Sequence, residues 1–381
     1  MTQTKVEAPF VEGGGGAPFR NKIINGDFQI HQRFDGSAVT AATGYQSFDR
    51  FKSVRVNTTG NWTVEKETLS AADVATTGHK QAMEIKCTGT DTSTASNEYN
   101  AMFHVIEANT LQDLNYGSSA AKSFTVSFWV RSYQTGVFVL GVAKEDGTTY
   151  YNRIEYTINA SNTWEHKTLV FSPTAGDTSL ITGANGYITN DNGNGIALYF
   201  MLNAGSNYHG TNNTWTTGSI ATSNQTNLLS STDNHWSITG LQLEAGDQST
   251  DFEYLPFDVQ LQRCQRYYYL HTSGAESNTS QVGIFSAYSS SNIQTSIFHP
   301  VQMRAAATAD FIQSTDYFVA YGNNGNDTFV GFDLGGEGNK NSSQLYTASG
   351  RGVSVTQASP YFVRVNGSTG ATAIVAFSAE F

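Results

Sequence analysis

The sequence predicts an all-β protein, an antiparallel jelly-roll sandwich followed by a second, smaller β-sandwich domain. Short segments in which apolar and polar residues alternate recur along the chain, separated by turn-rich runs. Helical spacing is confined to residues 258–266. The chain has 381 residues, 39% of them hydrophobic, which is enough for two or more domains that each bury a core.

The first β region covers residues 21–257. Within residues 123–131, Phe124, Val126 and Phe128 fall on one face of a strand, and polar residues with Trp129 fall on the other. Two strands joined by a turn at Glu145-Asp146-Gly147 follow. The sequence predicts further strands here at residues 48–56, 62–67, 82–87, 99–106, 137–142, 150–158, 165–171, 195–202 and 236–243.

The remainder of the chain divides into three segments. Residues 258–266, preceded by Pro256, are expected to form a short helix or linker. Residues 267–381 are expected to form the C-terminal β domain, with strands at 281–287, 293–298, 311–321, 329–333, 361–365 and 373–381. Residues 1–20 are expected to form a Gly/Pro-rich arm, in which Phe10 and Phe19 anchor the chain to a partner or to its own body. The alternative for this arm is a tag-like tail.

The composition excludes several classes of function. The formal net charge is −11, so no basic field exists to hold nucleic acid or an anionic membrane. The start of the chain lacks the apolar region of a secretory signal, and no window is long and apolar enough to insert in a membrane. Only 14% of residues are charged, whereas Ser, Thr and Asn supply roughly three residues in ten. A polar β-rich protein without an export signal is typical of a virion.

No catalytic or metal-binding pattern is present in the sequence. It contains neither a GxSxG elbow nor HExxH, so we expect no enzyme activity and no cofactor. Acid pairs such as Asp247 with Asp251, or Asp310 with Asp316, are interpreted as solvated loop residues. The histidines are scattered, and Cys87 and Cys264 lack ligand spacing and are expected to be buried.

Four residues are candidates for carbohydrate contact. Trp129 and Arg131 share the polar face of the strand at 123–131, where a ring and a guanidinium suit a sugar; the alternative is that Trp129 packs beneath a loop of the same sandwich. Tyr208 and Trp215 lie in the Asn/Thr/Gly-rich loop 204–232, outside any core periodicity. Exposed loop aromatics suit a ligand or, alternatively, a neighbouring subunit.

Several motifs, in order, resemble a known family. They are the opening NKIINGDF with Gln32-Arg33, YQSFDRF at 45–51, ITGLQLEAG at 238–246 with Phe252-Glu253-Tyr254, LQRCQRYY at 261–268, FHPVQMR at 298–304 and the final SAEF. Over residues 21–381 this order resembles the fibre-like and virion structural proteins of tailed phages that contain a carbohydrate-binding-module-like jelly roll.

The resemblance implies a virion protein of sandwich domains that contacts glycans, with a homotrimeric assembly. We expect a tail-fibre-like component that adheres to host-surface glycans by many weak contacts and is attached to other virion proteins by its arm, residues 1–20, which lie outside the resemblance. Modules that resemble this jelly roll sometimes hold a structural calcium between the first and last strands, where Asp27 and Glu244 lie, but we expect simple hydrogen bonding by both acids. Two other functions stay open: a capsid decoration or head-fibre protein, and a polysaccharide depolymerase.

Overall fold

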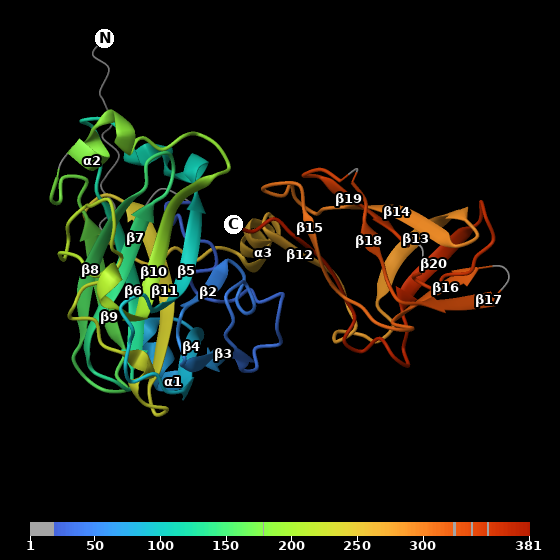
Figure 1. Ribbon diagram of the computed structural model, residues 1–381, viewed down its shortest axis with the longest axis horizontal. Coiled ribbons are helices and arrows are strands. Elements are labelled where there is room, and N and C mark those ends of the chain that lie inside the picture. Colours follow the sequence, from blue (N-terminus) through green and yellow to red (C-terminus); the bar gives the residue numbers. More distant parts are fainter. Residues whose placement is uncertain (1–18, 178, 323–324, 337, 349) are drawn as a thin grey trace, which may run out of the picture. The chain divides into compact units, whose positions relative to one another are not determined.

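The computed structural model describes residues 19–177, 179–322, 325–336, 338–348 and 350–381 (Figure 1). The chain forms two compact units. Unit 1 contains the residues up to 28 together with 37–46 and 51–255, and unit 2 contains 29–36, 47–50 and 256–381. Within the described residues, no helix has the length and apolar character needed to cross a membrane.

Unit 1 is a sandwich of two antiparallel sheets. The six-stranded sheet has the order β1-β3-β4-β11-β6-β9 and is built from β1 (Val39–Thr40), β3 (Asn61–Thr68), β4 (Gln81–Gly89), β11 (His235–Ala245), β6 (Phe124–Ser132) and β9 (Glu165–Phe171). The five-stranded sheet has the order β2-β5-β10-β7-β8 and is built from β2 (Phe51–Val56), β5 (Tyr99–Glu107), β10 (Asn194–Ala204), β7 (Gly136–Lys144) and β8 (Tyr150–Ile158).

The core of unit 1 lies between these sheets. Phe200 of the five-stranded sheet packs at 5.4 Å from Phe128 and at 5.7 Å from Trp236 of the six-stranded sheet, measured between ring centroids. Tyr156 also contacts Phe128, at 5.2 Å. Because side chains alternate along a strand, these contacts identify the inner face of each sheet and leave the intervening residues on the outer face.

Short helices complete unit 1. α1 (Ala71–Thr77) has a capping box, in which Ser70 accepts a bond from the Asp73 N–H and Asp73 bonds back to Ser70, and it ends at Gly78 in the left-handed region at φ 78°. The remaining helices are η1 (Ala108–Leu114), α2 (Ser179–Thr182), η2 (Ala184–Gly186), η3 (Ser206–Tyr208) and η4 (Leu228–Ser230).

Unit 2 is a smaller sandwich, and its main segment, residues 256–381, begins with α3 (Phe257–Gln265). Its three-stranded sheet is built from β12 (Tyr268–Ser273), β21 (Ile374–Ser378) and β15 (Thr308–Ile312), in that order. Its seven-stranded sheet is built, in order, from β17 (Gly325–Phe329), β16 (Phe318–Gly322), β20 (Pro360–Val365), β13 (Gln281–Ser289), β14 (Asn292–Phe298), β19 (Ser342–Tyr346) and β18 (Asp333–Leu334). Residues from both sheets share one core.

Two early segments of the chain belong to unit 2, although the sequence assigns them to the first domain. Arg50 pairs with Glu380 near the end of the chain, and Arg33 lies 3.3 Å from the other oxygen of the same carboxyl. Gln32 Nε2 donates to the Tyr268 carbonyl at 2.8 Å. These buried contacts bind residues 29–36 and 47–50 to unit 2, and residue spacing alone gives no sign of them.

The all-β fold class and the two sandwiches are confirmed. β8 and β9 have the predicted bounds, and α3 lies within one residue of the predicted helix. The predicted strand at 311–321 is wrong, because β15 and β16 are separate strands in different sheets. The strands β12 and β19 and the helix α1 were not predicted.

Candidate functional site

The outer face of the five-stranded sheet carries a group of aromatic side chains. Tyr199 lies next to the core residue Phe200 on β10 and therefore points to the opposite face. In the antiparallel register, Tyr199 is directly opposite Phe103 of β5, and Phe103 is directly opposite Lys52 of β2. The rings of Phe103 and Tyr199 meet edge to face, with centroids 4.7 Å apart.

More tyrosines extend this group. Tyr99 and Tyr208 make a second edge-to-face pair at 4.7 Å, and Tyr151 packs against the same apolar cluster as Tyr199. The four tyrosines are half-buried and Phe103 is buried, so ring surface remains accessible while the neighbouring packing fixes each ring. We call Tyr99, Phe103, Tyr151, Tyr199 and Tyr208 the tyrosine face.

Glu145 is the carboxyl at this face. It follows β7, and its backbone N–H donates to the Gly195 carbonyl at 2.9 Å, which fixes its position beside β10. Its Oε2 accepts from Asn194 Nδ2 at 2.8 Å, and its Oε1 accepts from the Tyr199 hydroxyl at 3.2 Å. Burial raises the pKa of Glu145, while the bonds from Asn194 and Tyr199 and the charge of Lys52 act in the opposite direction.

The hydroxyls of Tyr99, Tyr151 and Tyr199 are electrostatically coupled to that carboxyl. Burial first, and then the charge of Glu145, raise the pKa of Tyr199, and burial likewise raises the pKa values of Tyr99 and Tyr151. The hydroxyls are therefore protonated at neutral pH and available as hydrogen-bond donors and acceptors. The site thus combines flat rings, neutral hydroxyls and one oriented carboxyl.

A long loop, residues 205–232, covers the centre of the same sheet face. Ile220 and Ala221 of this loop pack on Val139 of β7 and Met201 of β10. A Cβ atom at Gly141 would lie 2.3 Å from the Ile220 carbonyl oxygen, so only glycine permits this close approach of loop to strand. The loop therefore lies directly on the sheet backbone.

Arg153 of β8 holds this loop against the sheet by hydrogen bonds. Its guanidinium is buried and donates to the Thr211 carbonyl at 2.8 Å, the Thr216 hydroxyl at 2.9 Å and the Ser219 carbonyl at 3.1 Å. Tyr151 and Thr216 also exchange two backbone hydrogen bonds, of 2.8 and 2.9 Å. The bound loop therefore forms the edge of the tyrosine face that lies next to β8.

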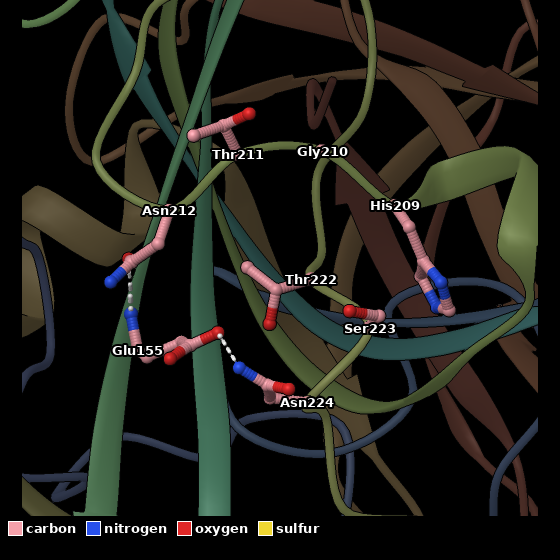
Figure 2. Close-up of a pocket in the computed structure, with 8 residues that line it drawn as sticks. All are labelled: Glu155, His209, Gly210, Thr211, Asn212, Thr222, Ser223 and Asn224. Atoms are coloured by element: carbon pink, nitrogen blue, oxygen red, sulfur yellow. Dashed lines mark hydrogen bonds between the residues drawn. The ribbon is translucent and has the colours of Figure 1, made fainter.

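A polar pocket of about 480 Å³ opens between β8 and this loop (Figure 2). Glu155 of β8 is at one side, where its carboxylate accepts from Asn224 Nδ2 at 3.1 Å and its N–H donates to Asn212 Oδ1 at 3.1 Å. The pocket is lined by Glu155, His209, Gly210, Thr211, Asn212, Thr222, Ser223 and Asn224. Its hydroxyls and amides supply hydrogen bonds, and its lining includes the imidazole of His209 but no Tyr, Phe or Trp ring.

The structure changes the interpretation of Trp215. Its side chain is only 1% exposed, and its indole N–H donates to the Ser172 carbonyl at 2.8 Å. The loop turns back, and Trp215 forms an isolated bridge with Gly176, which carries the ring into the body of unit 1. The predicted exposed position of Trp215 is therefore wrong. Tyr208, the other predicted loop aromatic, lies on the tyrosine face.

Trp129 and Arg131 lie on the outer face of the six-stranded sheet, as the alternation predicts. There Trp129, like Val74 of α1, packs against the buried cluster of Leu69, Ala82 and Trp164, in agreement with the alternative that this ring packs within the same sandwich. Arg131 pairs with Glu67, lies 3.7 Å from Asp73 and places its guanidinium 4.9 Å from the Trp164 ring. Both side chains are thus engaged within unit 1.

The structure describes one of the two predicted anchors and both candidate calcium ligands. Phe10 lies outside the described residues, whereas Phe19 has 57% of its surface exposed. Glu244 accepts from the Thr250 N–H at 2.7 Å and the Thr250 hydroxyl at 2.8 Å, and Asp27 is buried. Across the described ranges, no three potential ligands from His, Cys, Asp and Glu converge on one point.

Comparison with known proteins gives weak structural similarities. No protein-family model and no curated protein matches the sequence. The chain is similar to the enzymatically active domain of tailspike protein 4 of bacteriophage CBA120, with 11% identity and a TM-score of 0.29 over 60% of this chain and 22% of that one.

Two further solved structures show similarity at the same level. A putative sugar binding protein from Bacteroides thetaiotaomicron has 11% identity and a TM-score of 0.32, with 59% of this chain and 99% of that chain covered. The family 11 carbohydrate-binding module of the cellulase Lic26A-Cel5E of Clostridium thermocellum has 12% identity and a TM-score of 0.27, with 57% and 99% covered. The function proposed below rests on the tyrosine face.

Proposed function

We propose that unit 1 binds neutral carbohydrate on the tyrosine face. The observation that carries this proposal is the placement of four half-buried tyrosine rings on one sheet face, where the hydroxyl of one of them, Tyr199, bonds to the oriented carboxyl of Glu145. The C–H face of a sugar ring packs on an aromatic ring, and its hydroxyls exchange hydrogen bonds with phenol and carboxylate groups. The polar pocket beside Glu155 offers further hydrogen bonds to a longer chain.

Charge favours a neutral ligand over an anionic one. Unit 1 contains 22 acidic and 13 basic residues, so an anionic polysaccharide would be repelled. At the tyrosine face, the charge of Lys52 opposes that of Glu145. Affinity for neutral sugars comes from contact area and hydrogen bonds, which salt screens little.

Glu145 of the tyrosine face and Glu155 of the polar pocket lie too far apart to act together as a glycosidase pair. A glycosidase of the usual kind needs two carboxyl groups within roughly 5–10 Å. Glu155, the carboxyl of the polar pocket, is paired in register with Val139, six residues along the chain from Glu145. At about 3.3 Å per residue this places the two acids roughly 20 Å apart. We therefore propose adhesion without bond cleavage; release of new reducing ends from a polysaccharide would contradict this part of the proposal.

The binding test compares matched aromatic variants of the full chain. We expect Tyr199→Ala and Tyr99→Ala each to weaken binding of neutral polysaccharides about tenfold in affinity electrophoresis, equivalent to ~1.4 kcal/mol. Tyr133→Ala is the control, because Tyr133 is also exposed but follows β6 in the other sheet. Equal binding by all three variants and the unmodified protein would exclude the tyrosine face.

We further propose that the protein is a fibre-like component of a tailed-phage virion, present in several copies and attached by residues 1–20. The order of motifs over residues 21–381 supports this proposal. Multiple copies convert weak single-site binding into firm attachment. An antibody against residues 267–381 should label the tail in images of whole particles. Labelling of the head would instead favour a capsid decoration protein, and the absence of label on either would exclude both.

A further inference from the structure

The seven-stranded sheet of unit 2 buries one face and leaves the other open. Phe285, Ile293, Leu345 and Val363 point from neighbouring strands into the core. The residues that alternate with them belong to the outer face, and on most strands of a soluble protein such residues are polar. Here several of them are large and apolar.

Three of these apolar residues are directly opposite one another on neighbouring strands. Tyr321 of β16 is directly opposite Phe362 of β20, and Phe362 is directly opposite Ile284 of β13. Further along the sheet, Tyr288 lies on β13 and Phe298 at the end of β14. We call Ile284, Tyr288, Phe298, Tyr321 and Phe362 the open sheet face.

The exposed apolar area is large for a free surface. Ile284 is 70% exposed, Tyr288 68%, Phe298 77% and Phe362 37%. With 150–250 Å² for a large side chain, these four leave roughly 500 Å² uncovered. That is near the upper end for a monomer, and an interface buries about 800 Å² on each partner. The polar neighbours Ser286, Gln294, Ser296 and Gln344 on the same face supply the remaining area.

The net charge of the open sheet face favours a second copy of the chain as its partner. By strand alternation in the described residues, the charged groups on the open side are Arg364 and Asp333. Arg364 donates to the Tyr321 hydroxyl, and Asp333 at the sheet edge pairs with Arg351. The face is therefore close to neutral in a chain of net charge −11. Two copies repel one another over most of their surface and least at this face.

We propose that copies of this chain associate through the open sheet face. Sheet faces that pack on one another interdigitate their side chains at about 10 Å separation, which suits a row of Tyr, Phe and Ile. The most exposed residues, Phe298 and Ile284, have no polar side-chain atom, which favours a protein surface over a sugar as the occupant. This inference is independent of the tyrosine face, which lies in unit 1.

The test measures the mass of the full chain by sedimentation velocity over roughly two decades of concentration. We expect the unmodified protein to exceed the single-chain mass of 41.3 kDa. Ile284→Ser and Phe298→Ser should each weaken association at least tenfold, with no change in the thermal unfolding transition at concentrations where the proteins are monomeric. Ile312→Ser is the matched control, because Ile312 is 48% exposed in unit 2 but lies on β15 of the other sheet.

Several results would overturn the proposal. One is an unmodified protein that sediments at 41.3 kDa at every concentration. Another is an assembly that persists unchanged in both variants, which would place the interface elsewhere. If Ile284→Ser fails to fold, Tyr288→Ser provides the same test at a neighbouring exposed position. A monomer that loses polysaccharide binding in the Phe298→Ser variant would assign the face to glycan instead.

Discussion

The five-stranded sheet of unit 1 and the seven-stranded sheet of unit 2 both carry large apolar side chains on their outer faces, but these side chains are covered to different extents. In unit 1 a loop bound by Arg153 covers part of the face, and the uncovered part carries tyrosines linked to Glu145. In unit 2 the apolar residues of the face stand exposed, without a covering loop among the described segments. The polar tips in unit 1 suit a hydrated ligand, whereas the face in unit 2 suits another protein surface.

The two units also differ in net charge. Unit 1 has nine more acidic than basic residues, whereas unit 2 has ten acidic and eight basic residues. Most of the electrostatic repulsion between copies therefore comes from unit 1. The two proposals, carbohydrate binding by unit 1 and association through unit 2, therefore concern different units and can be tested separately.

The largest expected effect comes from the buried ion pair of unit 2. Arg50→Met leaves the Glu380 carboxyl buried with less compensation, and we expect the unfolding free energy of unit 2 to fall by about 3 kcal/mol. Calorimetry should show the unit 2 transition moving while that of unit 1 stays fixed.

The matched control for this variant is Arg351→Met. Arg351 and Asp333 form an ion pair whose side chains are 25% and 28% exposed, so its loss should cost less than about 1 kcal/mol. An equal loss of unfolding free energy in the two variants would mean that burial of the Arg50–Glu380 pair adds nothing to the stability of unit 2.

Acid should destabilise unit 1 through His79. This side chain is 4% exposed and packs edge to face on Phe252, and burial lowers its pKa to about 4. The unfolded chain takes up a proton near pH 6.5, so stability falls as the pH drops from about 6.5 to about 4, by up to about 3 kcal/mol.

The measurement is chemical denaturation of unit 1 at a series of pH values. His79→Phe should remove this part of the pH dependence. An unchanged slope between pH 6.5 and 4 in the variant would refute the assignment to His79.

The close approach of loop to strand predicts an intermediate effect. Gly141→Ala introduces a methyl group against the Ile220 carbonyl, and overpacking of this kind costs about 1–3 kcal/mol. We expect unit 1 to melt at a lower temperature and to lose polysaccharide affinity as the loop shifts. Gly218→Ala in the same loop, where a Cβ meets no atom within 4 Å, should change neither property.

The smallest expected effect tests the hydroxyl alone. Tyr199→Phe keeps the ring and removes the hydrogen bond to Glu145, which is worth about 1 kcal/mol. Carbohydrate affinity should fall about fivefold in titration calorimetry, less than for Tyr199→Ala. A larger loss for the phenylalanine variant would show that hydrogen bonding, and not ring stacking, dominates.

Strand positions were predictable wherever alternation was clear. β8 and β9 have one polar and one apolar face, and the sequence defines both their bounds. α1 was missed because its seven residues are too short for a periodic signal, although Ser70 and Asp73 carry the capping pattern.

The tyrosine face was largely hidden in the sequence. Tyr199 lies within the apolar run of β10, which is buried on both faces, so alternation does not distinguish its outer residues. Glu145 was interpreted only as a turn residue, and its contact with Tyr199 joins positions 54 residues apart. Trp215 was misplaced because backbone bridges that return a loop to the body leave no compositional signal.

The path of the chain through segments 29–36 and 47–50 restricts how the protein can be divided. The backbone passes from one unit to the other five times, so cleavage after Leu255 does not separate two complete halves. A recombinant fragment that begins at Pro256 lacks Arg33, Asp49 and Arg50, and its Glu380 would have no buried guanidinium from these segments. Residues 29–36 and 47–50 are therefore synthesised together with unit 1, and they can pack into unit 2 only after residues 256–381 have been synthesised.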